Sequence, residues 1–122
     1  MIMFDTNAAI YYLQNDGRTV RVVDELRRDR LSFVISTISE LEIFSFPGLT
    51  IPQMVEISTW LETLTRLTLD SITARDGARL RREYGLKTPD AVVAATALRY
   101  RMPLLTRDKD FGKVKELTII KC

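Results

Sequence analysis

Short apolar segments alternate with longer helical patterns along the whole chain, and polar residues follow most of the apolar segments. Apolar runs of four to six residues between turn signals are typical of buried strands, which are covered on both faces in a parallel sheet. In the second run, Leu-Ser-Phe-Val-Ile-Ser, several residues favour β-structure. The expected strands are residues 1–4, 31–36, 67–69, 103–106 and 117–120.

Between the strands, apolar positions recur at the spacing of a helix face. The sequence Asn15-Asp16-Gly17 indicates a turn between the first two helices, and Gly85 is suited to a left-handed helix end. Alanine recurs in the helix that follows Thr88, so we expect this helix to pack closely on its neighbours and to be central. The expected helices are residues 8–13, 19–30, 39 to about 46, 51–63, 71–84 and 89–100.

Alternating strands and helices predict an α/β fold with three layers, in which helices cover both faces of a mostly parallel sheet of about five strands. With 122 residues, we expect one domain over residues 1–122. No apolar run approaches the roughly 20 residues of a membrane span, and no secretory signal pattern is present. The one cysteine, Cys122, has no partner for an internal disulfide, so we expect a cytoplasmic protein.

The composition narrows the possible chemistry. Histidine is absent, which excludes Ser-His-Asp and Cys-His catalysis and histidine-ligated zinc. Residues 1–71 carry six basic and ten acidic side chains, and residues 72–122 carry twelve and six, so their net charges are −4 and +6. The basic second part favours a polyanionic partner such as nucleic acid, although its arginines are equally consistent with a solvated helix face.

Acidic residues stand where apolar segments give way to helices or turns. Each has a purely structural alternative: Asp5 is a suitable helix cap, and Ser39 with Glu42 matches a capping box. Asp90 is favoured near a helix start with Thr88 as its cap, and the last two acids suit a turn. The acidic residues at these points are Asp5, Glu42, Asp90, Asp108 and Asp110.

Their joint placement is what the structural alternatives leave unexplained. In a parallel sheet, the helix starts that follow strands lie along one edge, so these carboxylates would repel one another without a cation among them. A hard dication with oxygen ligands, Mg²⁺ or Mn²⁺, suits such a site and supports phosphoryl chemistry without histidine. Thr6, Asn7 and Thr106 supply polar groups that would orient the ligands or the substrate.

Four motifs together resemble the PIN-domain nucleases, and most of all the VapC-type toxins of toxin–antitoxin pairs. They are Asp-Thr-Asn at residues 5–7, Ser-x-x-Glu at residues 39–42, Pro-Asp-Ala-Val-Val-Ala-Ala-Thr-Ala-Leu at residues 89–98, and Leu-Leu-Thr-Arg-Asp-Lys-Asp-Phe at residues 104–111. The resemblance spans essentially the whole chain, and the last two motifs together are specific.

The resemblance implies a Mg²⁺- or Mn²⁺-dependent endoribonuclease that forms homodimers and is inhibited by a small antitoxin. It assigns Asp5, Glu42, Asp90 and Asp108 to the family's four acidic positions, with Asp110 as a further member. Asp5, Asp90 and Asp108 would hold metal, and Glu42 would ligate it or position the attacking water. The basic residues expected to steer RNA are Arg75, Arg79, Arg82, Arg107 and Lys109.

Three alternatives bear on this interpretation. Glu40 competes with Glu42, but at about 100° per residue it would point roughly 200° away on the helix. Aspartyl-phosphate phosphatases need a second acid two residues after the first, where this chain has Asn7. A non-catalytic PIN-like module that binds RNA or protein remains an alternative, although such a module would be expected to lack some of the acids.

Overall fold

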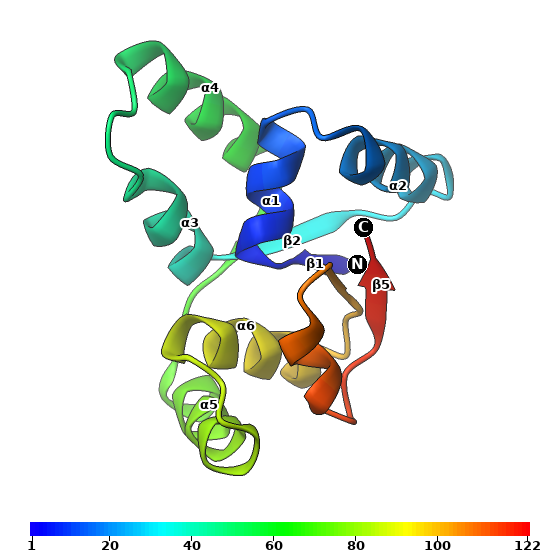
Figure 1. The fold of residues 1–122 in the computed structure, drawn as a ribbon, viewed down its shortest axis with the longest axis vertical. Coiled ribbons are helices and arrows are strands. Elements are labelled where there is room, and N and C mark those ends of the chain that lie inside the picture. Colours follow the sequence, from blue (N-terminus) through cyan, green and yellow to red (C-terminus); the bar gives the residue numbers. More distant parts are fainter.

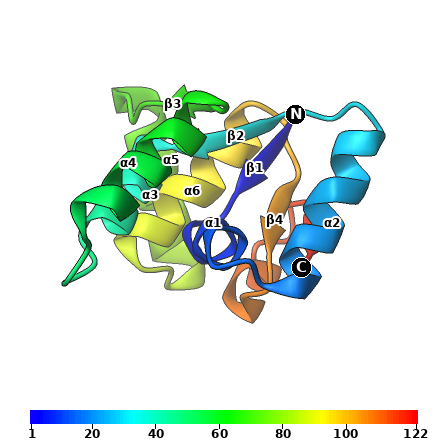
Figure 2. The same cartoon turned by 90° about the horizontal axis from the view of Figure 1, so that it is seen from above.

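Five short parallel strands form a central sheet in the computed structural model, which describes all residues 1–122 (Figure 1). The strand order is β3-β2-β1-β4-β5, and every neighbouring pair is parallel. Seen from above, β2, β1 and β4 follow one another across the sheet (Figure 2). The strands are β1 (Ile2–Phe4), β2 (Phe33–Ser36), β3 (Thr65–Leu67), β4 (Leu104–Thr106) and β5 (Ile119–Lys121).

Helices cover both faces of this sheet, which confirms the predicted α/β fold. In Figure 1, α1, α2 and α4 lie on one side of the strands and α5 and α6 on the other. None of the helices combines the length and the apolar character that a membrane-spanning helix requires. The helices are α1 (Thr6–Leu13), α2 (Gly17–Arg28), α3 (Thr37–Phe44), α4 (Ile51–Glu62), α5 (Ser71–Tyr84), α6 (Thr88–Arg99) and the short 3₁₀ helix η1 (Lys109–Lys113).

The strands supply both halves of the core because successive side chains point to opposite faces. Ile2 and Phe4 belong to one buried cluster, with residues of α1, α2 and α4, whereas Met3 belongs to the other, with residues of α5 and α6. The first cluster includes an aromatic group in which Phe4 stacks on Phe33 with ring centroids 4.9 Å apart. Residues 91–97 of α6 are all buried, so the alanine-rich helix is central as predicted.

The helix after β2 begins earlier than predicted. Ser36 has an extended backbone, and its Oγ atom accepts from the backbone N–H of Ile38 at 3.2 Å, so α3 starts at Thr37. Ser39 therefore lies inside the helix, and the predicted capping box with Glu42 is wrong. The physical reason is that Ser36 already satisfies one of the orphan donors of the first turn.

Two edge strands also differ from the prediction. The third strand is Thr65–Leu67 rather than residues 67–69, and its register with β2 pairs Val34 with Thr65. Its first two side chains are exposed, so the apolar pattern did not include them. The fifth strand is Ile119–Lys121 rather than residues 117–120, because the Leu117 N–H closes a turn on the Val114 carbonyl at 3.1 Å.

Candidate active site

The sheet has its topological switch point between β1 and β4. The chain adds β2 and then β3 on one side of β1, and later adds β4 and β5 on the other. In open parallel sheets, ligands bind beyond the carboxyl ends of the strands at such a point. Here Asp5 directly follows β1, and Thr106 is the last residue of β4. These two residues therefore mark the most suitable position for a site.

Asp5 is buried, with 3% of its surface exposed. It stands at the cap position of α1, but its side chain makes no cap hydrogen bond, so the structural alternative of a helix cap does not hold. Its Oδ2 atom instead accepts from the Thr106 hydroxyl at 2.9 Å. Burial, followed by the charges of Asp90 and Asp108, raises the pKa of Asp5 to about 7, against the opposing hydrogen bond from Thr106.

Glu42 reaches the site through Thr6. The Thr6 Oγ1 atom lies 2.8 Å from Glu42 Oε1 and 2.7 Å from Ser39 Oγ. Because a carboxylate only accepts, the single Thr6 proton goes to Glu42, and the Ser39 hydroxyl donates to Thr6. Ser39 is fully buried, and its supporting contact was missed in the sequence. Its position three residues before Glu42, on the same helix face, was the available signal.

Asp90 is the third residue of α6 and is half-buried. Lys87, not the predicted Thr88, occupies the cap position, and no side chain caps this helix. Burial raises the pKa of Asp90, and the charges of Asp108 and Glu42 raise it further, while Lys87 opposes them. The pKa of Asp90 is therefore affected by acids of two other segments, the loop after β4 and α3. Lys87 was also missed as a neighbour of the site, although it precedes Asp90 by only three residues.

Asp108 caps the 3₁₀ helix η1, with its Oδ1 atom accepting from the Asp110 backbone N–H at 2.9 Å. Its own backbone N–H donates to Thr106 Oγ1 at 3.0 Å. Asp110 is exposed and lies 3.4 Å from Lys113. The turn role considered for these two acids is thus present, and for Asp108 it coexists with a place beside Asp5 and Asp90. Asn7 is exposed and lines a shallow pocket with Thr6 and Glu42.

Glu40 lies on a different side of α3 from Glu42. It forms an ion pair with Arg66 of the edge strand β3, with Oε1 and Nη1 3.4 Å apart. The acids whose charges most affect Asp5 and Asp90 are others, and Glu42 is one of them for Asp90. The geometry therefore associates Glu42, and not Glu40, with the other carboxylates.

The acidic site fits a hard dication by the chemistry of its oxygen donors. Two of its acids, Asp5 and Asp90, have raised pKa values because burial disfavours their charged forms and neighbouring negative charges add to this effect. A bound cation would relieve this repulsion. In the structure as it stands, no three acidic side chains are grouped closely enough to hold a metal ion.

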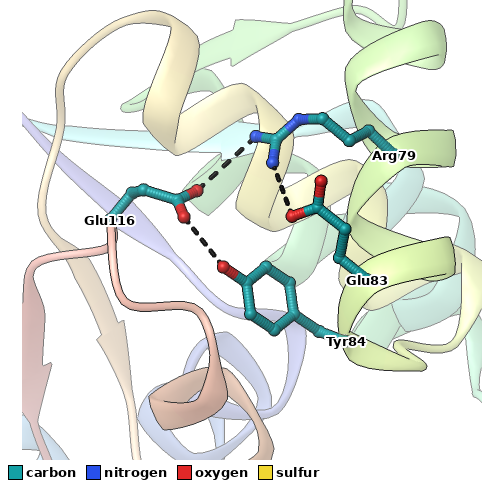
Figure 3. A network of polar contacts seen from close by, with 4 residues as sticks. All are labelled: Arg79, Glu83, Tyr84 and Glu116. Atoms are coloured by element: carbon teal, nitrogen blue, oxygen red, sulfur yellow. Dashed lines mark hydrogen bonds and ion pairs between the residues drawn. The ribbon is translucent and has the colours of Figure 1, made fainter.

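The five predicted RNA-steering residues differ in their availability. Arg79 is engaged by two acids, Glu83 at 3.0 Å and Glu116 at 3.5 Å, and Glu116 also accepts from Tyr84 (Figure 3). Arg107 pairs with Asp16 at 2.6 Å. All of the five except Arg79 are exposed: Arg107, Arg75 and Arg82 on α5, and Lys109 on η1.

The family model of the PIN domain matches residues 2–117. The chain therefore belongs to the PIN domain family, as its motifs predicted. Members of this family are typically nucleases. No curated protein sequence matches the chain.

Solved structures with the same fold extend over nearly the whole chain. One chain in a toxin–antitoxin complex from Klebsiella pneumoniae is 25% identical, with a TM-score of 0.82, covering 98% of this chain and 96% of that chain. A chain of DNA-bound VapBC from Salmonella typhimurium is 20% identical, with a TM-score of 0.83 and coverages of 99% and 98%. A chain of VapBC2 from Rickettsia felis, bound to a promoter DNA fragment, is 17% identical, with a TM-score of 0.82 and the same coverages.

Proposed function

We propose that this protein is a Mg²⁺- or Mn²⁺-dependent endoribonuclease and the toxin of a toxin–antitoxin pair. The proposal is supported by a PIN fold with four acids near its switch point, two of which have pKa values raised in part by the charges of the others. They come from the end of β1, from α3, from the start of α6 and from the loop after β4. These acids are Asp5, Glu42, Asp90 and Asp108.

Asp5, Asp90 and Asp108 would hold the metal. The ion, when bound, supplies positive charge for the phosphate and lowers the pKa of a water molecule. With a pKa of about 7, Asp5 holds a proton over part of the neutral range, and this proton must leave before the carboxylate can bind a cation. Thr106 favours the loss of this proton, because its hydroxyl donates a hydrogen bond to the charged form of Asp5.

Glu42 would position the attacking water and accept its proton. The Thr6 hydroxyl fixes one carboxylate oxygen of Glu42, which leaves the other oxygen for this task. The water oxygen bonds to phosphorus, the opposite bond from phosphorus to a ribose oxygen breaks, and that oxygen takes up a proton as it leaves. Exposed Arg75, Arg82 and Lys109 are the remaining candidates for contact with the RNA backbone.

A protein partner follows from two observations. The similar structures include toxin–antitoxin complexes, and we propose a small antitoxin for this chain as well. Large apolar side chains are also exposed on α3, on α4 and between them, and we propose that a homodimer or the antitoxin covers them. These side chains are Leu41, Phe46, Ile51, Met54 and Val55. Light scattering on the purified chain, with Val55→Asp as the variant, tests for the dimer.

A cytoplasmic location remains a prediction.

Cleavage of total cellular RNA by the purified, antitoxin-free chain tests the function. We expect cutting with Mg²⁺ or Mn²⁺, none with EDTA, and none by Asp90→Asn. Asp76→Asn is the matched control, because Asp76 is an exposed acid of α5 outside the site. Absence of cutting by folded protein in the presence of metal would contradict the proposal and favour a non-catalytic binding module.

A further inference from the structure

Arg107 lies between two site residues in the sequence, yet its side chain contacts another part of the molecule. Its Nη2 atom is 2.6 Å from Asp16 Oδ2 and donates to Thr19 Oγ1 at 2.8 Å. Its guanidinium carbon stands 3.9 Å from the centroid of the Tyr11 ring, a cation–π distance. All three partners belong to the end of α1 or the start of α2. Arg107 therefore joins the loop after β4 to the junction of two distant helices.

The junction of α1 and α2 is fixed by its own hydrogen bonds. Asp16 caps α2, and its Oδ2 atom accepts from the Thr19 backbone N–H at 3.1 Å and from the Thr19 hydroxyl at 2.8 Å. Thr19 is fully buried. Because the Thr19 hydroxyl gives its proton to Asp16, it accepts from Arg107, and the three side chains form a closed set of hydrogen bonds. The guanidinium is thus held by groups that the fold already fixes.

The loop that Arg107 holds includes two residues of the proposed site, Thr106 and Asp108. Thr106 donates to Asp5 at 2.9 Å and accepts from the Asp108 backbone N–H at 3.0 Å. The position of the Asp108 carboxylate therefore depends on the path of the backbone through residue 107. Displacement of a reacting group by about 1 Å can cost on the order of 100-fold in rate.

We propose that Arg107 is a positioning residue, which holds the Thr106–Asp108 loop on the start of α2 and so keeps the Asp108 carboxylate in the site. The inference rests on the proposed function for the reaction that Asp108 serves. It replaces the RNA contact that the sequence suggested for Arg107. Asp16 already balances the charge of the guanidinium, whose Nη2 donates both to Asp16 and to Thr19.

The first test needs no catalysis. Hydrogen exchange at the Asp108 and Asp110 amides, in metal-free protein, reports the hydrogen bonds that fix this loop. In Arg107→Ala and Asp16→Asn we expect exchange at both amides to be faster by about tenfold, since the loop opens more often. Asp16→Asn keeps a side-chain oxygen to cap α2, and it decides the question if Arg107→Ala does not fold. Arg75→Ala, an exposed arginine of α5, is the control and should leave both rates unchanged.

The second test separates positioning from RNA binding. We expect Arg107→Ala to lower kcat for RNA cleavage by at least about tenfold while KM stays within about twofold. The Asp16→Asn/Arg107→Ala double variant should lose no more than Arg107→Ala alone, because both act through one contact. A raised KM with unchanged kcat, and a salt dependence of RNA binding that is weaker by about one charge, would overturn the inference. So would unchanged amide exchange. If the wild-type chain cleaves no RNA, the proposed function fails, while the exchange rates still decide the role of Arg107.

Discussion

The Thr106 hydroxyl donates to the Asp5 carboxylate at 2.9 Å and thereby joins the carboxyl ends of β4 and β1. The two residues are 101 positions apart in the chain. The same hydroxyl accepts the backbone N–H of Asp108 at 3.0 Å. One buried side chain therefore orients two of the acids on which the proposed chemistry depends.

Thr106→Val tests this relationship with little change in volume. The valine leaves Asp5 without its donor and the Asp108 amide without its acceptor, so we expect a loss of about 1–3 kcal/mol in the free energy of unfolding. Urea unfolding followed by the fluorescence of Trp60, the single tryptophan, measures it. Thr106→Ser retains the hydroxyl and should therefore retain most of the stability that Thr106→Val loses. No loss in Thr106→Val, or a larger loss in Thr106→Ser than in Thr106→Val, would contradict this role of the hydrogen bonds.

Asp5 should make the metal-free protein less stable as the pH rises. Its pKa is about 7 in the folded chain and 3.8 as the ordinary value, so the folded state holds the proton more tightly. Its contribution to stability is therefore fully present below about pH 4 and is lost as the pH rises through about 7. A pKa difference of about three corresponds to at most about 4 kcal/mol.

The corresponding variant is Asp5→Asn, which stays neutral and can still accept from Thr106. In EDTA, the difference in the free energy of unfolding between variant and wild type should grow in favour of the variant from about pH 4 to pH 8. Chemical denaturation at several pH values measures it. Parallel curves for the two proteins would mean that the pKa of Asp5 is not raised.

Substitution by glutamine should have a large effect on RNA cleavage at Glu42 and little effect at Glu40, although both glutamates belong to α3. Glu42→Gln retains a side-chain oxygen beside Thr6 but cannot accept a proton, so we expect RNA cleavage to fall by at least about 100-fold. Glu40→Gln removes only an exposed ion pair with Arg66 and should retain activity within about twofold. Single-turnover rates with one RNA substrate compare them. Similar losses in both variants would remove the special role of Glu42.

Gly85 should tolerate a side chain poorly because of its backbone conformation and not because of a steric clash. It ends α5 with a φ of 69°, and a Cβ built there meets no atom within 4 Å. Gly85→Ala should therefore lower the free energy of unfolding by about 1–2 kcal/mol through left-handed strain without a clash. Gly112→Ala is the control, since it has the same open surroundings and no positive φ. Thermal unfolding of both distinguishes strain from the mere addition of a methyl group.

The sequence predicted the elements that are strongly apolar. Residues 2–4 and 33–36 are short apolar runs because they are buried on both faces of the sheet, and the alanine-rich α6 is buried along residues 91–97. The edge strand β3 was predicted two residues too late in the chain because it is held by backbone pairing with β2, while Thr65 and Arg66 face solvent. A pattern of apolar residues carries no information on such pairing.

The positions of the acids were predictable, but their hydrogen-bond partners were not. Turns and helix starts indicated Asp5, Asp90 and Asp108, since parallel strands share one edge. That Ser39 supports Thr6 instead of capping a helix, or that Arg107 binds Asp16, depends on contacts 33 and 91 residues apart in the chain. Such contacts follow from the packing of elements that local sequence patterns do not relate.

The central claim is that the acids at the end of β1, in α3, in α6 and after β4 form one metal-dependent site for RNA cleavage. The most direct test is the single-turnover cleavage rate of one RNA over a Mn²⁺ titration, for the wild type, Asp90→Asn and Asp76→Asn. We predict saturable cleavage that EDTA abolishes and added metal restores, a loss of at least about 100-fold in Asp90→Asn, and little change in Asp76→Asn. Cleavage that persists in EDTA, or a folded Asp90→Asn as active as the wild type, would contradict the claim.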